Sequence, residues 1–169
     1  MIPVRGYKDC FVGVLGLGLT GLATAEALKR GGARPLNWDD DPDSRERAKE
    51  TGLTIADLND EEVLSKLSIL IVSPGIPHLY PKPHPIIVKA LSIGVVIDND
   101  ISLFFRSFAL ESWAQFQVMP KVVCVTGSNG KSTTTALLEH ILAKNGIPVE
   151  SGGNIGKAVL SLQPGIEKE

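Results

Sequence analysis

Two glycine-rich turns, each between an apolar run and a helix-patterned segment, constrain the fold of this chain more than any other feature. The first is Gly16-Leu17-Gly18-Leu19-Thr20-Gly21, between the apolar run 11–15 and a helix predicted over 20–30. The second is Thr126-Gly127-Ser128-Asn129-Gly130-Lys131-Ser132-Thr133, between the apolar run 122–125 and a helix predicted over 131–145. A turn that joins a strand to a helix points free backbone N–H groups at an anion. Both turns therefore predict phosphate-binding sites in an α/β protein.

Apolar runs alternate with helical patterns along the rest of the chain, as in βαβ units with a parallel sheet. Strands are predicted over 11–15, 35–38, 69–72, 95–97 and 122–125, and helices over 20–30, 43–51, 86–92, 100–108 and 131–145. We therefore expect a doubly wound, Rossmann-like parallel-sheet domain over 1–118. A P-loop ATPase domain would start at 119 and be incomplete at 169, because about fifty residues cannot bury a nucleotide-binding core alone.

The first turn matches G-x-G-x-x-G in its required context, with Asp39 at the end of the next strand. Gly16 permits the tight turn, Gly18 lets the backbone approach a phosphate, and Gly21 lets helix and strand pack closely. Asp39 is placed to accept hydrogen bonds from a ribose or a base. The motif does not specify the nucleotide, since NAD and a UDP-sugar are held by the same mechanics. Glycines that only pack a helix on a strand are the structural alternative.

The second turn resembles a Walker A loop, although Val125 stands where the generic pattern has its first glycine. Backbone N–H groups over 128–131 can form a nest for an anion. Lys131 can reach the β- and γ-phosphates, and Ser132 can hold Mg²⁺. The predicted ligand is ATP with Mg²⁺. A dehydrogenase would need the first turn but has no use for the second.

Composition and charge argue against several other classes of function. The formal net charge is -2 with scattered Lys and Arg, which does not suit a nucleic-acid binder. The apolar stretch 10–23 is too short and glycine-rich for a bilayer, so we expect a cytoplasmic protein without a membrane partner. Cys10 and Cys124 have no C-x-x-C partner, so zinc and redox chemistry have no support. His78 and His84 lack metal-spaced partners and are expected to be solvated.

Five motifs occur in the order found in the D-glutamate-adding members of the Mur ligase family, which the chain resembles over essentially its whole length. These are 16–21, Ser73-Pro74-Gly75-Ile76, Asp100-Ile101-Ser102-Leu103-Phe104, 126–133 and Gly152-Gly153-Asn154-Ile155-Gly156. The resemblance implies an ATP-dependent ligase that adds D-glutamate to UDP-N-acetylmuramoyl-L-alanine in cytoplasmic peptidoglycan precursor synthesis, and a monomer when full length. ATP would phosphorylate the substrate carboxylate, and the D-glutamate amine would attack the acyl phosphate.

The resemblance also implies roles for the matching residues. Lys131 would be catalytic by neutralising charge on the transferring phosphoryl group, and Ser132 would be a metal ligand. The UDP-sugar would be held by Gly16, Leu17, Gly18, Leu19, Thr20, Gly21, Asp39, Asp40, Ser73, Gly75 and Asn154, and ATP by Gly127, Ser128, Asn129, Gly130, Lys131, Ser132 and Thr133. Two positions depart from the family: Asp40 replaces a threonine that can contact uracil, and Ser102 replaces the usual glutamate.

Two other functions stay open at this point: a non-catalytic nucleotide-binding module, and an NAD-dependent oxidoreductase that uses the first turn. The family's further Mg²⁺ ligands and its D-glutamate-binding domain would lie beyond Glu169. The 169-residue chain is therefore expected to bind the UDP-sugar and to be inactive as a ligase alone.

Overall fold

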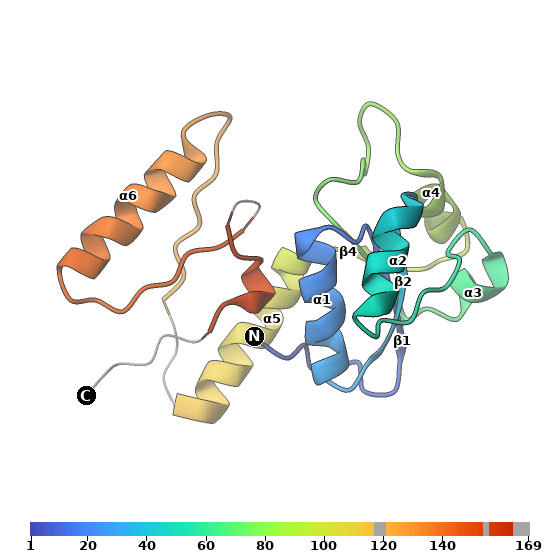
Figure 1. Cartoon of the computed structure of the whole chain (residues 1–169), viewed down its shortest axis with the longest axis horizontal. Coiled ribbons are helices and arrows are strands. Elements are labelled where there is room, and N and C mark those ends of the chain that lie inside the picture. Colours follow the sequence, from blue (N-terminus) through green and yellow to red (C-terminus); the bar gives the residue numbers. More distant parts are fainter. Residues whose placement is uncertain (117–120, 154–155, 164–169) are drawn as a thin grey trace.

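A computed structural model describes residues 1–116, 121–153 and 156–163, and it contains one parallel sheet with helices on both faces (Figure 1). The strand order is β2-β1-β3-β4, with β1 (Phe11–Leu15), β2 (Arg34–Trp38), β3 (Ile69–Val72) and β4 (Ile97–Asp98). The helices are α1 (Leu19–Arg30), α2 (Pro42–Glu50), α3 (Glu61–Ser65), α4 (Pro85–Ser92), α5 (Asp100–Phe116), α6 (Lys131–Lys144) and the 3₁₀ turn η1 (Val159–Ser161). The predicted doubly wound, Rossmann-like sheet is confirmed.

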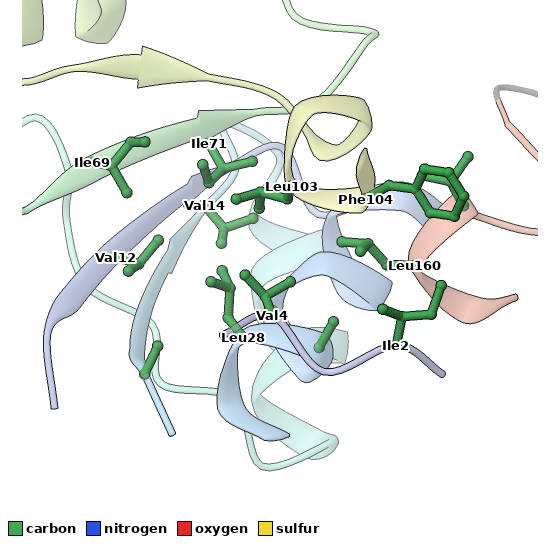
Figure 2. Close-up of a cluster of buried hydrophobic side chains, with 14 of the residues drawn as sticks. Ile2, Val4, Val12, Val14, Leu28, Ile69, Ile71, Leu103, Phe104 and Leu160 are labelled. Carbon is green, nitrogen blue, oxygen red and sulfur yellow. The ribbon is translucent and has the colours of Figure 1, made fainter. Parts of the chain in front are cut away.

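The central strands are apolar on both sides, so each face of the sheet has its own core. On one face, Val12 and Val14 of β1 pack with Leu28 of α1 and with α5 (Figure 2). On the other face, Leu70 and Val72 of β3 pack with α3 and α4. Alternation of side chains along a strand produces this division, and strands buried on both faces read as continuous apolar runs.

The strand order reverses between β1 and β3, because the chain leaves β1 to form β2 on one side and returns to form β3 on the other. Ligands of doubly wound sheets bind at such a switch point, outside the carboxyl ends of the strands. The first glycine turn follows β1, and Ser73 follows β3. The fold therefore brings these two predicted segments to one place.

The outer edge of β2 is closed by the chain itself. Asn37 donates its backbone N–H to the carbonyl oxygen of Thr54 at 3.0 Å, and its side-chain amide donates to the same oxygen at 2.9 Å. Pro35 faces the same edge, because alternate residues of a strand point the same way, and it has no N–H. Arg34 instead faces β1, where its N–H donates to the carbonyl oxygen of Cys10.

Residues 158–162, which we call the hook, return to the core beside α1 and α5. Val159, Leu160 and Leu162 are buried in the same cluster as Ile2. The backbone N–H of Ile2 donates to the carbonyl oxygen of Leu160 at 2.8 Å, and Leu160 is only 1% exposed. In this part of the chain, the residues that the structure describes form only the single turn η1.

The strand predicted over 122–125 is wrong, because residues 121–126 have no regular secondary structure. A strand is stable only beside a partner strand, and none of the four described strands pairs with this segment. The helix predicted after the second turn is confirmed as α6, although none of its residues is buried. The predicted helix over 100–108 extends to Phe116.

Candidate functional site

The first glycine turn is held tightly against the end of the sheet. Gly16 has a φ of 92°, which favours glycine, and its N–H donates to the carbonyl oxygen of Trp38 at 2.8 Å. The Ser73 hydroxyl donates to the Gly16 carbonyl oxygen at 2.8 Å. A Cβ on Gly21 would lie 1.8 Å from that same oxygen. Gly21 therefore lets α1 approach the turn closely, as its place in the motif predicts.

Gly18 differs from Gly21, because it faces open space. It is the residue before α1, its backbone is extended with a φ of -70°, and a Cβ built there meets no atom within 4 Å. Leu17 is buried, whereas Leu19 is 66% exposed. The first N–H groups of a helix have no partners within the helix, and the helix dipole makes this end positive. The turn thus presents an uncrowded N-terminus to an anion, with Thr20 in the first turn of α1.

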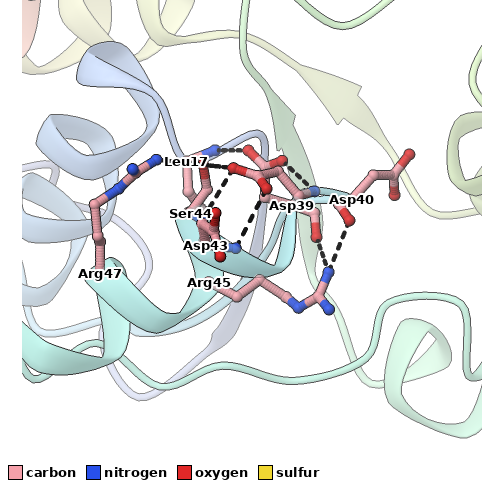
Figure 3. A network of polar contacts seen from close by, with 8 residues as sticks. Leu17, Asp39, Asp40, Asp43, Ser44, Arg45 and Arg47 are labelled. Atoms are coloured by element: carbon pink, nitrogen blue, oxygen red, sulfur yellow. Dashed lines mark hydrogen bonds and ion pairs between the residues drawn. The ribbon is translucent and has the colours of Figure 1, made fainter.

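Asp39 connects the first turn to the start of α2. Its carboxylate accepts a hydrogen bond from the Leu17 N–H at 2.6 Å and another from the Asp41 N–H at 3.0 Å (Figure 3). Sequence reasoning placed Asp39 at the ligand, and the structure shows that it also fixes the conformation of the glycine turn. A carboxylate has about four acceptor positions, so these two bonds leave room for a ligand hydroxyl or N–H.

Asp40 forms a hydrogen bond to His84 that the sequence did not predict. Its carboxylate lies 2.9 Å from His84 Nε2, and the hydrogen bond from His84 holds the Asp40 pKa below its usual value. The Nδ1 atom of His84 accepts the Ile86 N–H at 3.3 Å and so caps α4. Only 11% of the His84 side chain is exposed, so the interpretation of His84 as solvated is wrong. The two partners are separated by 44 residues, and no local pattern signals such a contact.

Arg45 is a second group that sequence reasoning missed. Its guanidinium lies over the Trp38 ring, 4.5 Å from the centroid. It also donates to the carbonyl oxygens of Asp39 and Asp40 at 2.7 and 3.0 Å (Figure 3). It therefore adds positive charge and rigidity to the acidic turn after β2. Trp38 at the end of a strand, with a basic residue seven positions later in the following helix, is the only sequence signal of this stacking.

A hollow of about 660 Å³ opens beyond the carboxyl ends of β3 and β4, beside Ser73. Asp100 at the start of α5 is 4% exposed, and burial raises the pKa of its carboxyl group. Gly75 is exposed nearby in sequence, with nothing within 4 Å of a built Cβ. The residues around the hollow are Val72, Pro74, His78, Asn99, Asp100, Ile101, Ser102, Phe105 and Arg106.

The second glycine turn is exposed and precedes α6. Lys131 folds over its own turn, donating to the carbonyl oxygens of Gly127 at 2.5 Å and Ser128 at 3.2 Å. Gly130 has a φ of 77°, a conformation that favours glycine. Across the described residues, no hydrogen bond or ion pair joins this turn to the first one. The predicted ligand Asn154 lies outside the described residues.

The predicted Mg²⁺ site has one described donor, the Ser132 hydroxyl at the start of α6. A hard oxygen suits Mg²⁺, which is usually held by few protein groups together with substrate phosphates. In the parts of the chain that the structure describes, no group of three or more His, Cys, Asp or Glu residues could hold a metal ion. None of the helices in the described ranges has the length and apolar character needed to cross a membrane.

A doubly wound parallel sheet with a G-x-G-x-x-G turn at its switch point defines an α/β nucleotide-binding fold. Residues 11–98 match the family of the Mur ligase MurD-like N-terminal domain, so the chain belongs to this family. It is 57% identical to the UDP-N-acetylmuramoylalanine--D-glutamate ligase of Cereibacter sphaeroides (strain ATCC 17029 / ATH 2.4.9) over 169 residues, which is 100% of this chain and 36% of the relative.

Two further relatives carry the same name. The ligase of Ruegeria pomeroyi is 58% identical over 99% of this chain and 36% of its own length, and that of Dinoroseobacter shibae is 53% identical over 98% and 36%. The chain thus spans about 36% of the length of these curated relatives. Among solved structures, shikimate dehydrogenase from Aquifex aeolicus aligns with a TM-score of 0.47 and 15% identity, over 70% of this chain and 52% of that one.

Proposed function

We propose that this chain supplies the UDP-sugar-binding part of an ATP-dependent ligase that adds D-glutamate to UDP-N-acetylmuramoyl-L-alanine. The main support is its 57% identity, over all 169 residues, to a ligase that bears that name. In this proposal the protein works in the cytoplasm, in peptidoglycan precursor synthesis, as a monomer when full length. Residues 1–118 form the UDP-sugar-binding domain, and 119–169 begin the ATP-binding domain.

The first turn and its neighbours would hold the UDP moiety. The pyrophosphate would lie at the N-terminus of α1, where Gly18 leaves room and the helix dipole favours negative charge. Asp39 would meet the uridine while it holds the turn through Leu17. Asp40 would lie beside it, with its carboxylate kept ionised by His84. Ser73 and Gly75 would form the wall on the β3 side, and Asn154 would meet the pyrophosphate.

The second turn would hold ATP. Residues 127–130 would surround the phosphates with backbone N–H groups, and Lys131 would move from its own turn carbonyls to the transferring phosphoryl group. Ser132 and Thr133 would lie at the phosphates, with Mg²⁺ at the Ser132 hydroxyl neutralising phosphate charge when bound. ATP would then activate the substrate carboxylate as an acyl phosphate, which the amine of D-glutamate attacks with release of phosphate.

Calorimetric titration of the 169-residue chain tests the first part of this proposal. UDP-N-acetylmuramoyl-L-alanine and UDP are expected to bind, and NADH is not. Gly18→Val should weaken UDP-sugar binding while the melting temperature is unchanged, because a Cβ at this position meets no atom within 4 Å. Lys29→Val, at the exposed far end of the same helix, is the matched control and should bind like the parent chain. Tight NADH binding without UDP-sugar binding would refute the proposal and favour an oxidoreductase.

A further inference from the structure

We propose that the hook positions the second glycine turn relative to the UDP-binding sheet, with Leu160 as its anchor and Glu150 and Ser151 as its links to α6. This inference rests on the proposed function, because the relative position of the two glycine turns matters only if both bind their nucleotides. The contacts that carry it run without interruption from the core to α6, entirely through described residues.

The anchor is the first step. Leu160 lies between Ile2 and Phe104 of α5 (Figure 2), and Val159 and Leu162 are buried on either side of it. The Ile2 N–H bonds to the Leu160 carbonyl oxygen at 2.8 Å. Side chains that are buried to this degree in the core shared with α1 and α5 hold the segment 158–162 in one position.

The second step is the junction between the hook and residues 150–153, which precede it in the chain. The Glu150 carboxylate accepts the backbone N–H of Gln163 at 2.7 Å and pairs with Lys157 at 3.1 Å. These two contacts, the first being the larger effect, hold the Glu150 pKa below its usual value. A Cβ on Gly152 would lie 2.7 Å from the Lys157 carbonyl oxygen and 3.0 Å from Leu162, so the segment lies directly on the hook.

The third step leads to the helix of the second turn. The hydroxyl of Ser151 donates to the Glu139 carboxylate of α6 at 2.6 Å. Since α6 has no buried residue, it receives no support from a core of its own among the described residues. The bond to Ser151 is therefore a principal restraint on α6, and it connects the anchor at Leu160 to the helix of the second turn.

Hydrogen exchange followed by mass spectrometry on the ligand-free 169-residue chain tests the anchor. Leu160→Ala should speed exchange of peptides that span 150–163 by about tenfold or more, equivalent to about 1.4 kcal/mol of local stability. Leu64→Ala is the matched control: Leu64 is equally buried but lies in the core on the opposite face of the sheet. It should lower the melting temperature without selectively exposing 150–163.

Ser151→Ala tests the link. It should speed exchange of α6 and leave the peptides over 158–163 protected, because the anchor remains intact. Equal effects of Leu160→Ala and Leu64→Ala on 150–163, or an unchanged α6 in Ser151→Ala, would overturn the proposal. UDP-sugar titration of the parent chain separates the two ideas: the proposed function fails if that ligand does not bind, whereas the hook proposal fails on the exchange pattern alone.

Discussion

Gly21→Ala is expected to destabilise the protein through a single added methyl group. That carbon would lie 1.8 Å from the Gly16 carbonyl oxygen, 2.8 Å from its carbonyl carbon and 3.0 Å from the Ser73 hydroxyl oxygen. The nearest obstacle is backbone, so α1 and the turn must separate by about 1 Å rather than rotate a side chain away. The change therefore disturbs the two segments that meet at the switch point.

The expected change in the free energy of unfolding is the sum of two opposing effects. Overpacking against a rigid neighbour costs about 3 kcal/mol, at the upper end of the usual range. Alanine in place of glycine within a helix returns about 1 kcal/mol. The net loss of about 2 kcal/mol should lower the melting temperature by about 4–8 °C for a chain of this size. Scanning calorimetry or circular dichroism measures it directly.

Two other glycines provide the controls. Gly18→Ala adds the same methyl group where nothing lies within 4 Å, and it should melt with the parent chain. Gly31→Ala places a carbon 1.7 Å from the Val4 carbonyl oxygen, away from the glycine turn, and should destabilise comparably without a specific loss of UDP-sugar affinity in the folded protein. A Gly21→Ala protein that melts within about 1 °C of the parent would show that the close approach of α1 to the turn is absent.

Asp39→Ala removes the carboxylate that accepts the Leu17 N–H at 2.6 Å, so urea denaturation should show a loss of about 1–2 kcal/mol of folding free energy. The same change should weaken UDP-sugar binding, and unchanged binding would exclude a role for Asp39 in the site. Burial raises the pKa of the Asp100 carboxyl group above 3.8. The protonated group therefore contributes to folding stability below pH 3.8, and this contribution is lost as the pH rises through the raised pKa. Asp100→Asn should therefore raise the melting temperature at neutral pH and lose that advantage as pH falls to 3.8, and a pH-independent difference would contradict this reasoning.

The sheet and its first turn could be predicted from the sequence because their signals are local. The run Ile69–Val72 is apolar throughout, as a strand buried on both faces must be, and it was predicted with the correct bounds. The glycine spacing located the turn at the start of α1. In contrast, α3 has five residues, too few for a periodic pattern, and was missed although Asp60 caps it.

The contacts around the site depend on residues far apart in the chain, which explains why sequence reasoning did not find them. His84 contacts Asp40 only because the end of β2 and the start of α4 lie near each other in space. The strand over 122–125 was predicted from its apolar residues, but Val123 is 67% exposed and has no partner strand. A local sequence pattern indicates that a segment can form a strand, whereas pairing with a neighbouring strand decides whether it does so.

The closed edge of β2 has a consequence for the behaviour of the protein at high concentration. An exposed strand edge can recruit a strand from another molecule, which leads to aggregation. On this side Pro35 has no N–H to offer, and the N–H of Asn37 already bonds to Thr54. Intermolecular strand addition is therefore blocked at β2, and the two-residue strand β4 at the opposite edge offers a template too short to propagate.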